Sequence, residues 1–127
     1  MRAAQDPPAG SFNREAAKRG KRLFRGEARC ATCHQSPNYK DVLGGPAQTL
    51  PFLHDPAEVG MDPGCADWTA TGRYRTTPLR RLWQHPPYFH DGSAPDLLAV
   101  VDHDSQLLEL SLSAVQKADL VECLKSL

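Results

Sequence analysis

One five-residue segment limits the fold more than any other feature of this sequence. Cys30 and Cys33 are separated by two residues, and His34 follows directly. This spacing matches the attachment of a c-type haem, in which two thiols bond to the vinyl groups at one edge of the porphyrin and the histidine binds the iron. The segment therefore predicts one covalent haem c, attached through Cys30 and Cys33, with His34 as the proximal iron ligand.

Two other kinds of site also use closely spaced cysteines. A zinc site needs a second pair of ligands, and Cys65 and His54 do not supply one at the spacing of a zinc finger. A thioredoxin-like redox pair needs a strand–helix–strand context, which the pattern lacks, and the histidine after Cys33 argues against it. Since the motif occurs once, we expect a mono-haem protein whose default activity is electron transfer.

The apolar pattern predicts an all-α domain in which helices and long irregular loops surround one haem c. Helix-start signals and apolar residues at three- and four-residue steps predict four helices, at 12–24, 77–84, 93–102 and 113–127. No segment alternates as a strand would. Residues 1–11 are polar and contain prolines, so we expect a flexible lead-in followed by a single domain over 12–127.

Composition limits the partners and the membrane topology. The longest apolar run, Leu97–Val101, is far shorter than the roughly 20 residues that span a bilayer, so we expect no membrane-spanning helix. Residues 1–40 hold nine Lys and Arg against three Asp and Glu, whereas residues 41–127 hold six against twelve. The basic segment is either a solvated helix face or a docking face for an acidic redox partner. Nothing in the pattern indicates nucleic-acid binding.

The cysteines also bear on the compartment. Residues 1–10 lack the apolar stretch of a secretory signal, yet covalent haem attachment normally follows export. We therefore expect a periplasmic or extracellular protein whose leader has been removed, or one domain of a longer chain. Cys65 and Cys123 remain after the haem has taken the other pair, and in an oxidising compartment they are candidates for a disulfide.

Two further stretches resemble a known family. Gly20 and Phe24 before the haem motif, together with an amphipathic last helix, resemble the crossed end helices of class I cytochromes c. The stretch 72–80 (Gly-Arg-Tyr-Arg-Thr-Thr-Pro-Leu-Arg) and the stretch 87–92 (Pro-Tyr-Phe-His-Asp-Gly) closely resemble the C-terminal haem domain of the bacterial di-haem cytochrome c peroxidase and MauG family. The resemblance implies an electron-relay haem, with His90 in a structural role. The peroxide-reacting haem of that family lies in an N-terminal domain that has no counterpart here.

The sixth iron ligand is left open by the sequence. The resemblance implies Met or Tyr about four helical turns beyond the His-Asp-Gly string, where this chain has Asp104. Met61 is a thioether candidate, and His103 could serve after a one-residue shift. An open or water-bound site near Asp104 is the third alternative, and His54 and His85 are less favoured.

Three functional classes follow from these alternatives. The first is a mono-haem electron carrier, which we take as the main interpretation. The second is enzymatic, either a peroxidase or the relay domain of a di-haem enzyme. The third is a haem module that binds a small ligand. Arginines could pair with the haem propionates, and tryptophans could pack at the ring edge; the candidates are Arg73, Arg75 and Arg80, and Trp68 and Trp83.

Overall fold

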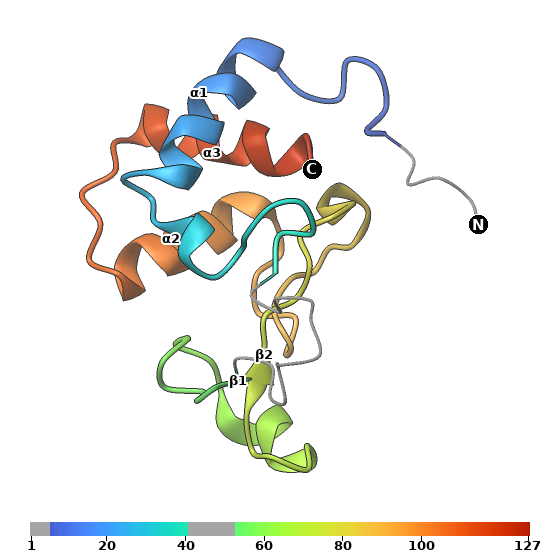
Figure 1. The fold of residues 1–127 in the computed structure, drawn as a ribbon, viewed down its shortest axis with the longest axis vertical. Coiled ribbons are helices and arrows are strands. Elements are labelled where there is room, and N and C mark those ends of the chain that lie inside the picture. Colours follow the sequence, from blue (N-terminus) through green and yellow to red (C-terminus); the bar gives the residue numbers. More distant parts are fainter. Residues whose placement is uncertain (1–5, 41–52) are drawn as a thin grey trace.

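The computed structural model describes residues 6–40 and 53–127, which form a helical part and a smaller part beside it (Figure 1). The helical part contains three α-helices, α1 (Arg14–Arg25), α2 (Leu97–Leu107) and α3 (Ala114–Lys125). The smaller part contains two strands and a 3₁₀ helix, β1 (Leu53–His54), η2 (Pro63–Trp68) and β2 (Tyr74–Arg75). Two further 3₁₀ helices are η1 (Cys30–Thr32) and η3 (Leu82–Gln84).

The prediction of an all-α fold is wrong, because β1 and β2 pair as a two-stranded antiparallel sheet. Leu53 lies opposite Arg75, and His54 lies opposite Tyr74. Each strand is only two residues long, which is too short to show the alternation by which a strand is recognised. The sheet depends on a contact between segments that are distant in the sequence, and no local pattern encodes that contact.

Helix α1 forms where the apolar spacing predicts a helix. It begins after Asn13, whose side-chain oxygen accepts a hydrogen bond from the Ala16 N–H at 2.9 Å. This cap satisfies one of the backbone donors that a helix leaves unpaired at its start. The buried face consists of four small or aromatic residues, Ala16, Ala17, Gly20 and Phe24.

The two end helices pack directly across each other at Gly20. A Cβ atom at this position would lie 2.0 Å from the Asp119 carbonyl oxygen and 2.8 Å from the Cys123 Cβ atom, so only glycine allows the approach. Beside it, Arg19 donates from Nε and Nη2 to the Asp119 carboxylate at 2.8 and 2.6 Å. At the start of α3, Ser113 and Gln116 form the predicted capping box.

Two of the predicted helices differ from the observed ones. The helix predicted over 77–84 is wrong: its last three residues form η3, and Arg81 has a φ of 61°, which lies outside the right-handed helical region. The helix predicted to end near Asp102 is instead longer, since α2 runs to Leu107. Asp96 caps α2 by accepting from the Ala99 N–H at 2.9 Å.

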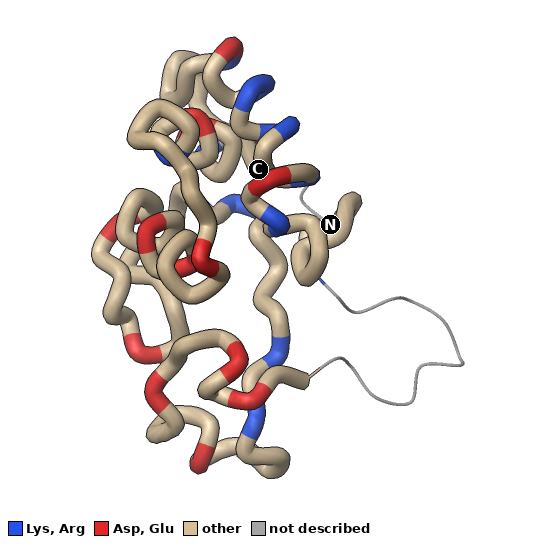
Figure 2. The backbone as a smooth tube through the Cα atoms, turned by 90° about the vertical axis from the view of Figure 1, so that its left-hand side faces the viewer, with Lys and Arg blue, Asp and Glu red and all other residues tan. Residues whose placement is uncertain are grey.

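The basic and acidic residues, which are unevenly distributed along the sequence, are also unevenly distributed over the structure. Figure 2 shows that Lys and Arg gather on α1, whereas Asp and Glu are spread over α2 and the smaller part. Within 6–40 and 53–127, no helix has the length and apolar character needed to cross a membrane.

Candidate haem-binding site

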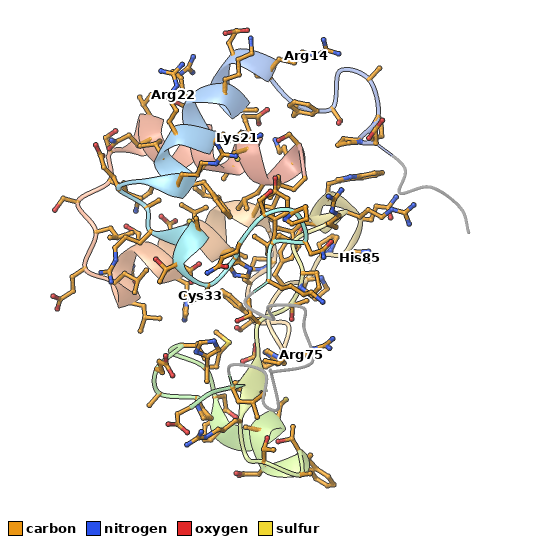
Figure 3. All side chains as sticks on the ribbon, viewed as in Figure 1. Arg14, Lys21, Arg22, Cys33, Arg75 and His85 are labelled. Atoms are coloured by element: carbon orange, nitrogen blue, oxygen red, sulfur yellow. The ribbon has the colours of Figure 1, made fainter. Side chains whose placement is uncertain are left out.

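A tight turn brings the two ends of the Cys30–His34 motif together. Arg29 has a φ of 57° and redirects the chain after α1, and η1 starts directly at Cys30. The His34 backbone N–H donates to the Cys30 carbonyl oxygen at 2.9 Å. Figure 3 shows Cys33 on this turn, beside α2 at the lower edge of the helical part. The turn holds Cys30, Cys33 and His34 within one compact segment, and of the three Cys30 and His34 line the adjacent cavity, whereas Cys33 does not.

The imidazole of His34 is oriented by a backbone oxygen. Its Nδ1 atom lies 2.8 Å from the Tyr39 carbonyl oxygen, which can only accept. Nδ1 is therefore the donor in this contact, and Nε2 is the ring nitrogen that would bind a metal. Histidines that bind metals usually donate their other ring N–H in this way. Tyr39 is itself packed edge-on against Phe24, with ring centroids 5.9 Å apart.

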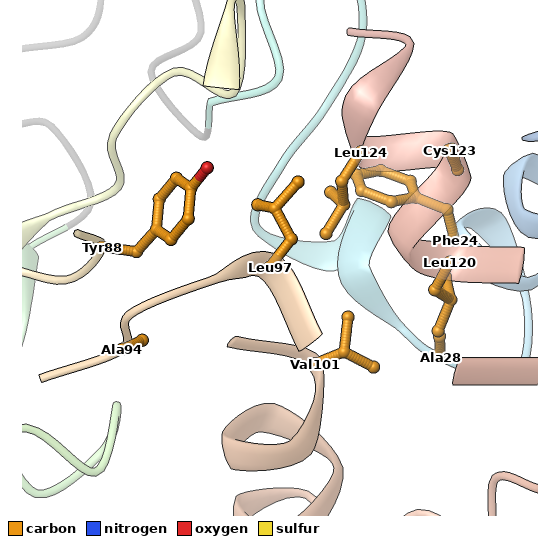
Figure 4. Close-up of a cluster of buried hydrophobic side chains, with 9 residues drawn as sticks. All are labelled: Phe24, Ala28, Tyr88, Ala94, Leu97, Val101, Leu120, Cys123 and Leu124. Atoms are coloured by element: carbon orange, nitrogen blue, oxygen red, sulfur yellow. The ribbon is translucent and has the colours of Figure 1, made fainter. Parts of the chain in front are cut away.

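An apolar cavity lies next to this turn. Cys30 and His34 line one part of it, Asp104 and Ser105 of α2 add two polar side chains, and the remaining lining is apolar and comes mainly from the three α-helices and from the segments around η3 and before α3. Most of these apolar residues belong to the buried cluster in Figure 4, or pack against it. A porphyrin is a large apolar ring, so the apolar lining, with the sulfur of Cys30 and a ring nitrogen of His34 beside it, matches a haem in chemical character.

The Cys30 thiol is protonated. Burial, followed by the negative charge of Asp104, raises the pKa of Cys30 to about 12. A thiol that stays neutral suits a thioether bond in an apolar wall better than it suits a zinc site, which requires thiolates. Among the described residues, no group of three His, Cys, Asp or Glu side chains could hold a metal ion by itself.

The structure separates the candidates for the sixth ligand. Asp104 lines the same cavity as Cys30 and His34, whereas Met61 and His103 do not. The His103 ring is turned toward the loop before η2, where its Nε2 atom lies 3.1 Å from the Gly60 carbonyl oxygen. Sequence reasoning treated His103 and Asp104 as neighbours one residue apart, but a helix points adjacent side chains in different directions.

Comparisons with known proteins point to one family. The chain is 30% identical to the cytochrome-c peroxidase IdrP2 of Pseudomonas sp. (strain SCT) over 87% of its length. It is 34% identical to the methylamine utilization protein MauG of Methylorubrum extorquens over 68% of its length. A solved MauG-like protein associated with microbial copper homeostasis superposes on 98% of the chain, with a TM-score of 0.72 and 25% identity. The chain is a MauG-like haem domain.

The relatives are longer than this MauG-like domain. The chain spans 39% of IdrP2, 24% of MauG and 52% of the solved MauG-like protein. A hydrazine synthase of Kuenenia stuttgartiensis shares the fold, with a TM-score of 0.61 and 23% identity over 97% of the chain. The domain matches no profile of a known protein family. Its cytochrome c peroxidase and MauG relatives carry haem c.

Two of the other histidines, His54 and His90, make contacts in the smaller part. His90 stacks on Tyr74 with ring centroids 4.0 Å apart, and burial lowers its pKa. The Nδ1 atom of His54 lies 3.1 Å from Glu58. His85 is exposed and lies away from Cys33 (Figure 3). None of these three histidines lines the cavity.

Two of the three candidate arginines have partners within the protein. Arg73 pairs with Asp55 at 3.0 Å, and Arg80 donates to the Pro37 carbonyl oxygen. Within the described residues, two buried nitrogens lack a hydrogen-bond partner, Arg81 Nε and Trp83 Nε1. These residues flank Leu82, which lines the cavity. Sequence reasoning did not single out Arg81, because a surface arginine and a buried one look alike in a pattern. Trp68, which was expected at the ring edge, is 93% exposed.

Cys65 and Cys123 are not brought together. Cys65 is exposed on η2 in the smaller part, with its Sγ atom 3.9 Å from the His90 carbonyl oxygen. Cys123 is buried on α3, against Gly20 of α1. Both are free thiols in this structure, and the predicted disulfide is not formed in it.

Proposed function

We propose that this domain carries one haem c, bound through Cys30 and Cys33 with His34 as the proximal ligand, and that it transfers electrons. The observation that supports this best is the shared position of Cys30 and His34 at an apolar cavity, with Nδ1 of His34 held by the Tyr39 carbonyl oxygen. When bound, the haem supplies an iron that cycles between the ferrous and ferric states.

The residues of this chain have distinct roles in holding the group. Cys30 and Cys33 would hold the group through thioether bonds, each formed by addition of an S–H across one vinyl double bond, which needs no leaving group and no oxidant. His34 presents Nε2, and the apolar walls exclude water and stabilise the ring by burial. The unpartnered nitrogens of Arg81 and Trp83 are suitable donors for the haem carboxylates.

The domain resembles a relay, so its electrons come from another redox centre. We propose that an acidic partner, or an acidic surface of a longer protein, docks on α1. Exposed basic side chains cover the outer side of this helix: Lys18, Lys21, Arg22 and Arg25. Opposite charges accelerate encounter, and salt weakens that effect. We propose a periplasmic or extracellular location, because covalent haem attachment normally follows export.

Covalent attachment is the test of this proposal. The chain should be produced together with an export leader and a cytochrome c maturation system. We expect its mass to exceed that of the polypeptide by one haem, and the haem to stay attached through acid–organic extraction. The double variant Cys30→Ala/Cys33→Ala should lose both properties, and the control variant Cys65→Ala should keep them. A haem that extracts freely from the matured chain would overturn the proposal.

Reduction of peroxide is a second candidate. The names of the relatives and the presence of Asp104 in the cavity favour it. Because the chain spans less than half of those curated relatives, we expect it to be a poor peroxidase when isolated. Turnover on the order of ten per second or more, which is typical of dedicated enzymes, would support the enzymatic role instead.

A further inference from the structure

We propose that Asp104, and neither Met61 nor His103, occupies the sixth-ligand side of the haem, and that the reduced iron therefore binds a small neutral ligand such as carbon monoxide. This inference rests on the haem attachment proposed above. It assigns a role to Asp104, which stands where the resembled family has Met or Tyr.

The first argument is the face that α2 turns toward the cavity. Val100, Val101, Asp104 and Ser105 line it, and the pairs 100/104, 101/104 and 101/105 have the three- and four-residue spacing of one helix face. The Ser105 hydroxyl donates a hydrogen bond to the Leu110 carbonyl oxygen at 3.2 Å, just beyond the end of α2, so its proton is already engaged. The Asp104 carboxylate is thus the group on this wall that is available to an iron or to a water molecule.

The second argument is the setting of that carboxylate. Its side chain is 47% exposed, so water reaches it, while one carboxylate oxygen lies 3.1 Å from Nδ1 of His103. That contact fixes the direction of the side chain. The charge of Asp104 also contributes to the raised pKa of the Cys30 thiol, which agrees with its place in the same cavity.

The third argument removes the competing ligands. Nε2 of His103 lies 3.1 Å from the Gly60 carbonyl oxygen, and the Phe89 ring packs on the imidazole with centroids 4.7 Å apart. Gly60, at a φ of +64°, approaches so closely that a Cβ atom there would lie 3.0 Å from Nε2. Met61 belongs to the same loop, where its backbone N–H donates to the Pro56 carbonyl oxygen at 2.8 Å. The His103 side chain would have to break this packing to reach the cavity, and Met61 is not among the residues that line it.

Ligand chemistry links this geometry to binding. Carboxylate oxygen is a hard donor, and soft ferrous iron binds it weakly compared with thioether sulfur or imidazole. Reduction should therefore free the sixth position, and an incoming neutral ligand need displace only a carboxylate or a water. A strong internal ligand has the opposite effect, because it reduces the fraction of protein that is competent to bind.

The experiment uses the matured, haem-loaded chain and compares spin state with carbon monoxide binding. We expect a high-spin ferric signal by electron paramagnetic resonance, and stoichiometric carbon monoxide binding after reduction. Asp104→Met introduces a thioether and should convert the iron to low spin. If the thioether occupies the iron nine-tenths of the time, the apparent carbon monoxide affinity falls about tenfold. Asp102→Met is the matched control, because Asp102 lies on α2 outside this cavity and pairs with Lys117 at 2.8 Å. It should leave both readouts unchanged.

The outcomes separate the two proposals. Low-spin iron in both oxidation states of the unmodified chain would overturn the role of Asp104 and leave the haem attachment standing. Identical electron paramagnetic resonance spectra and carbon monoxide affinities for the unmodified chain and Asp104→Met would also overturn the role of Asp104 and leave the haem attachment standing. Loss of covalent haem would overturn the attachment, and the inference with it. The spin state of the unmodified chain decides the matter even if Asp104→Met does not fold.

Discussion

Replacing Gly20 by alanine tests the crossing of α1 and α3, on which the haem cavity depends. The new Cβ atom would lie 2.0 Å from the Asp119 carbonyl oxygen, and real Cβ contacts below 3.0 Å essentially do not occur. The carbonyl belongs to the backbone of α3 and cannot rotate aside. The two helices must therefore separate by about 1 Å, and a gap of this size forfeits a quarter to a half of the dispersion energy of the contacts involved.

The size of the effect follows from two opposing contributions. Overpacking of a buried contact typically costs about 1–3 kcal/mol, and 2.0 Å to a backbone atom belongs at the upper end. Alanine also favours the helix over glycine by up to about 1 kcal/mol. We expect a net loss of about 2 kcal/mol in the free energy of unfolding. At about 4 °C per kcal/mol for a domain of this size, the Tm should fall by about 8 °C.

Thermal and urea unfolding of the haem-loaded chain, followed by circular dichroism, would measure this loss. The control is Lys21→Ala, since Lys21 is the next residue on α1 and is exposed. Its free energy of unfolding should change by no more than about 0.5 kcal/mol. A Gly20→Ala variant as stable as the unmodified chain would refute the close approach of the two helices.

Three further predictions concern α3 and the free cysteines. Arg19 holds the pKa of Asp119 below the ordinary value of an aspartate, so this pair stabilises the fold fully at pH values above that ordinary pKa. As the pH falls through the lowered pKa of Asp119, the free energy of unfolding measured with urea should decline. Asp119→Asn should flatten this decline, and an unchanged pH dependence would contradict the prediction. Ser113→Ala removes the capping box and should cost about 1 kcal/mol in urea unfolding, against no measurable change for the exposed Ser111→Ala. Thiol titration of the denatured, unreduced holoprotein should find two thiols, Cys65 and Cys123, and a count of zero would show that they form a disulfide despite their separation in this structure.

The sequence predicted the end helices well because their signals are local. Asn13 and Ser113 cap helices through hydrogen bonds to residues three positions further on. The apolar faces of α1 and α3 repeat every three or four residues, and this spacing is a property of each helix alone. The helix crossing at Gly20 was expected from the resemblance of Gly20 and Phe24 to the end helices of class I cytochromes c, and α1 and α3 do cross there.

The same local reasoning failed where a residue's partner is distant in the sequence. The strands β1 and β2 are stabilised by each other. Thr77 and Pro78 predicted the start of a helix, but the φ of Arg81 lies outside the right-handed helical region. The pairing of Cys65 with Cys123 was argued from compartment and from the apolar face of α3. The structure places them in different parts of the molecule.

The sequence alone carries the chemistry proposed for the site, because Cys30, Cys33 and His34 lie within five residues and their spacing is itself the signal for haem attachment. It also determined the basic character of α1, since charge is additive along a helix face. Only the tertiary structure decided which side chain shares the cavity with His34. Asp104 and His103 are adjacent in the sequence, but the rotation of α2 and the position of the Gly60 loop direct one toward the cavity and the other away from it.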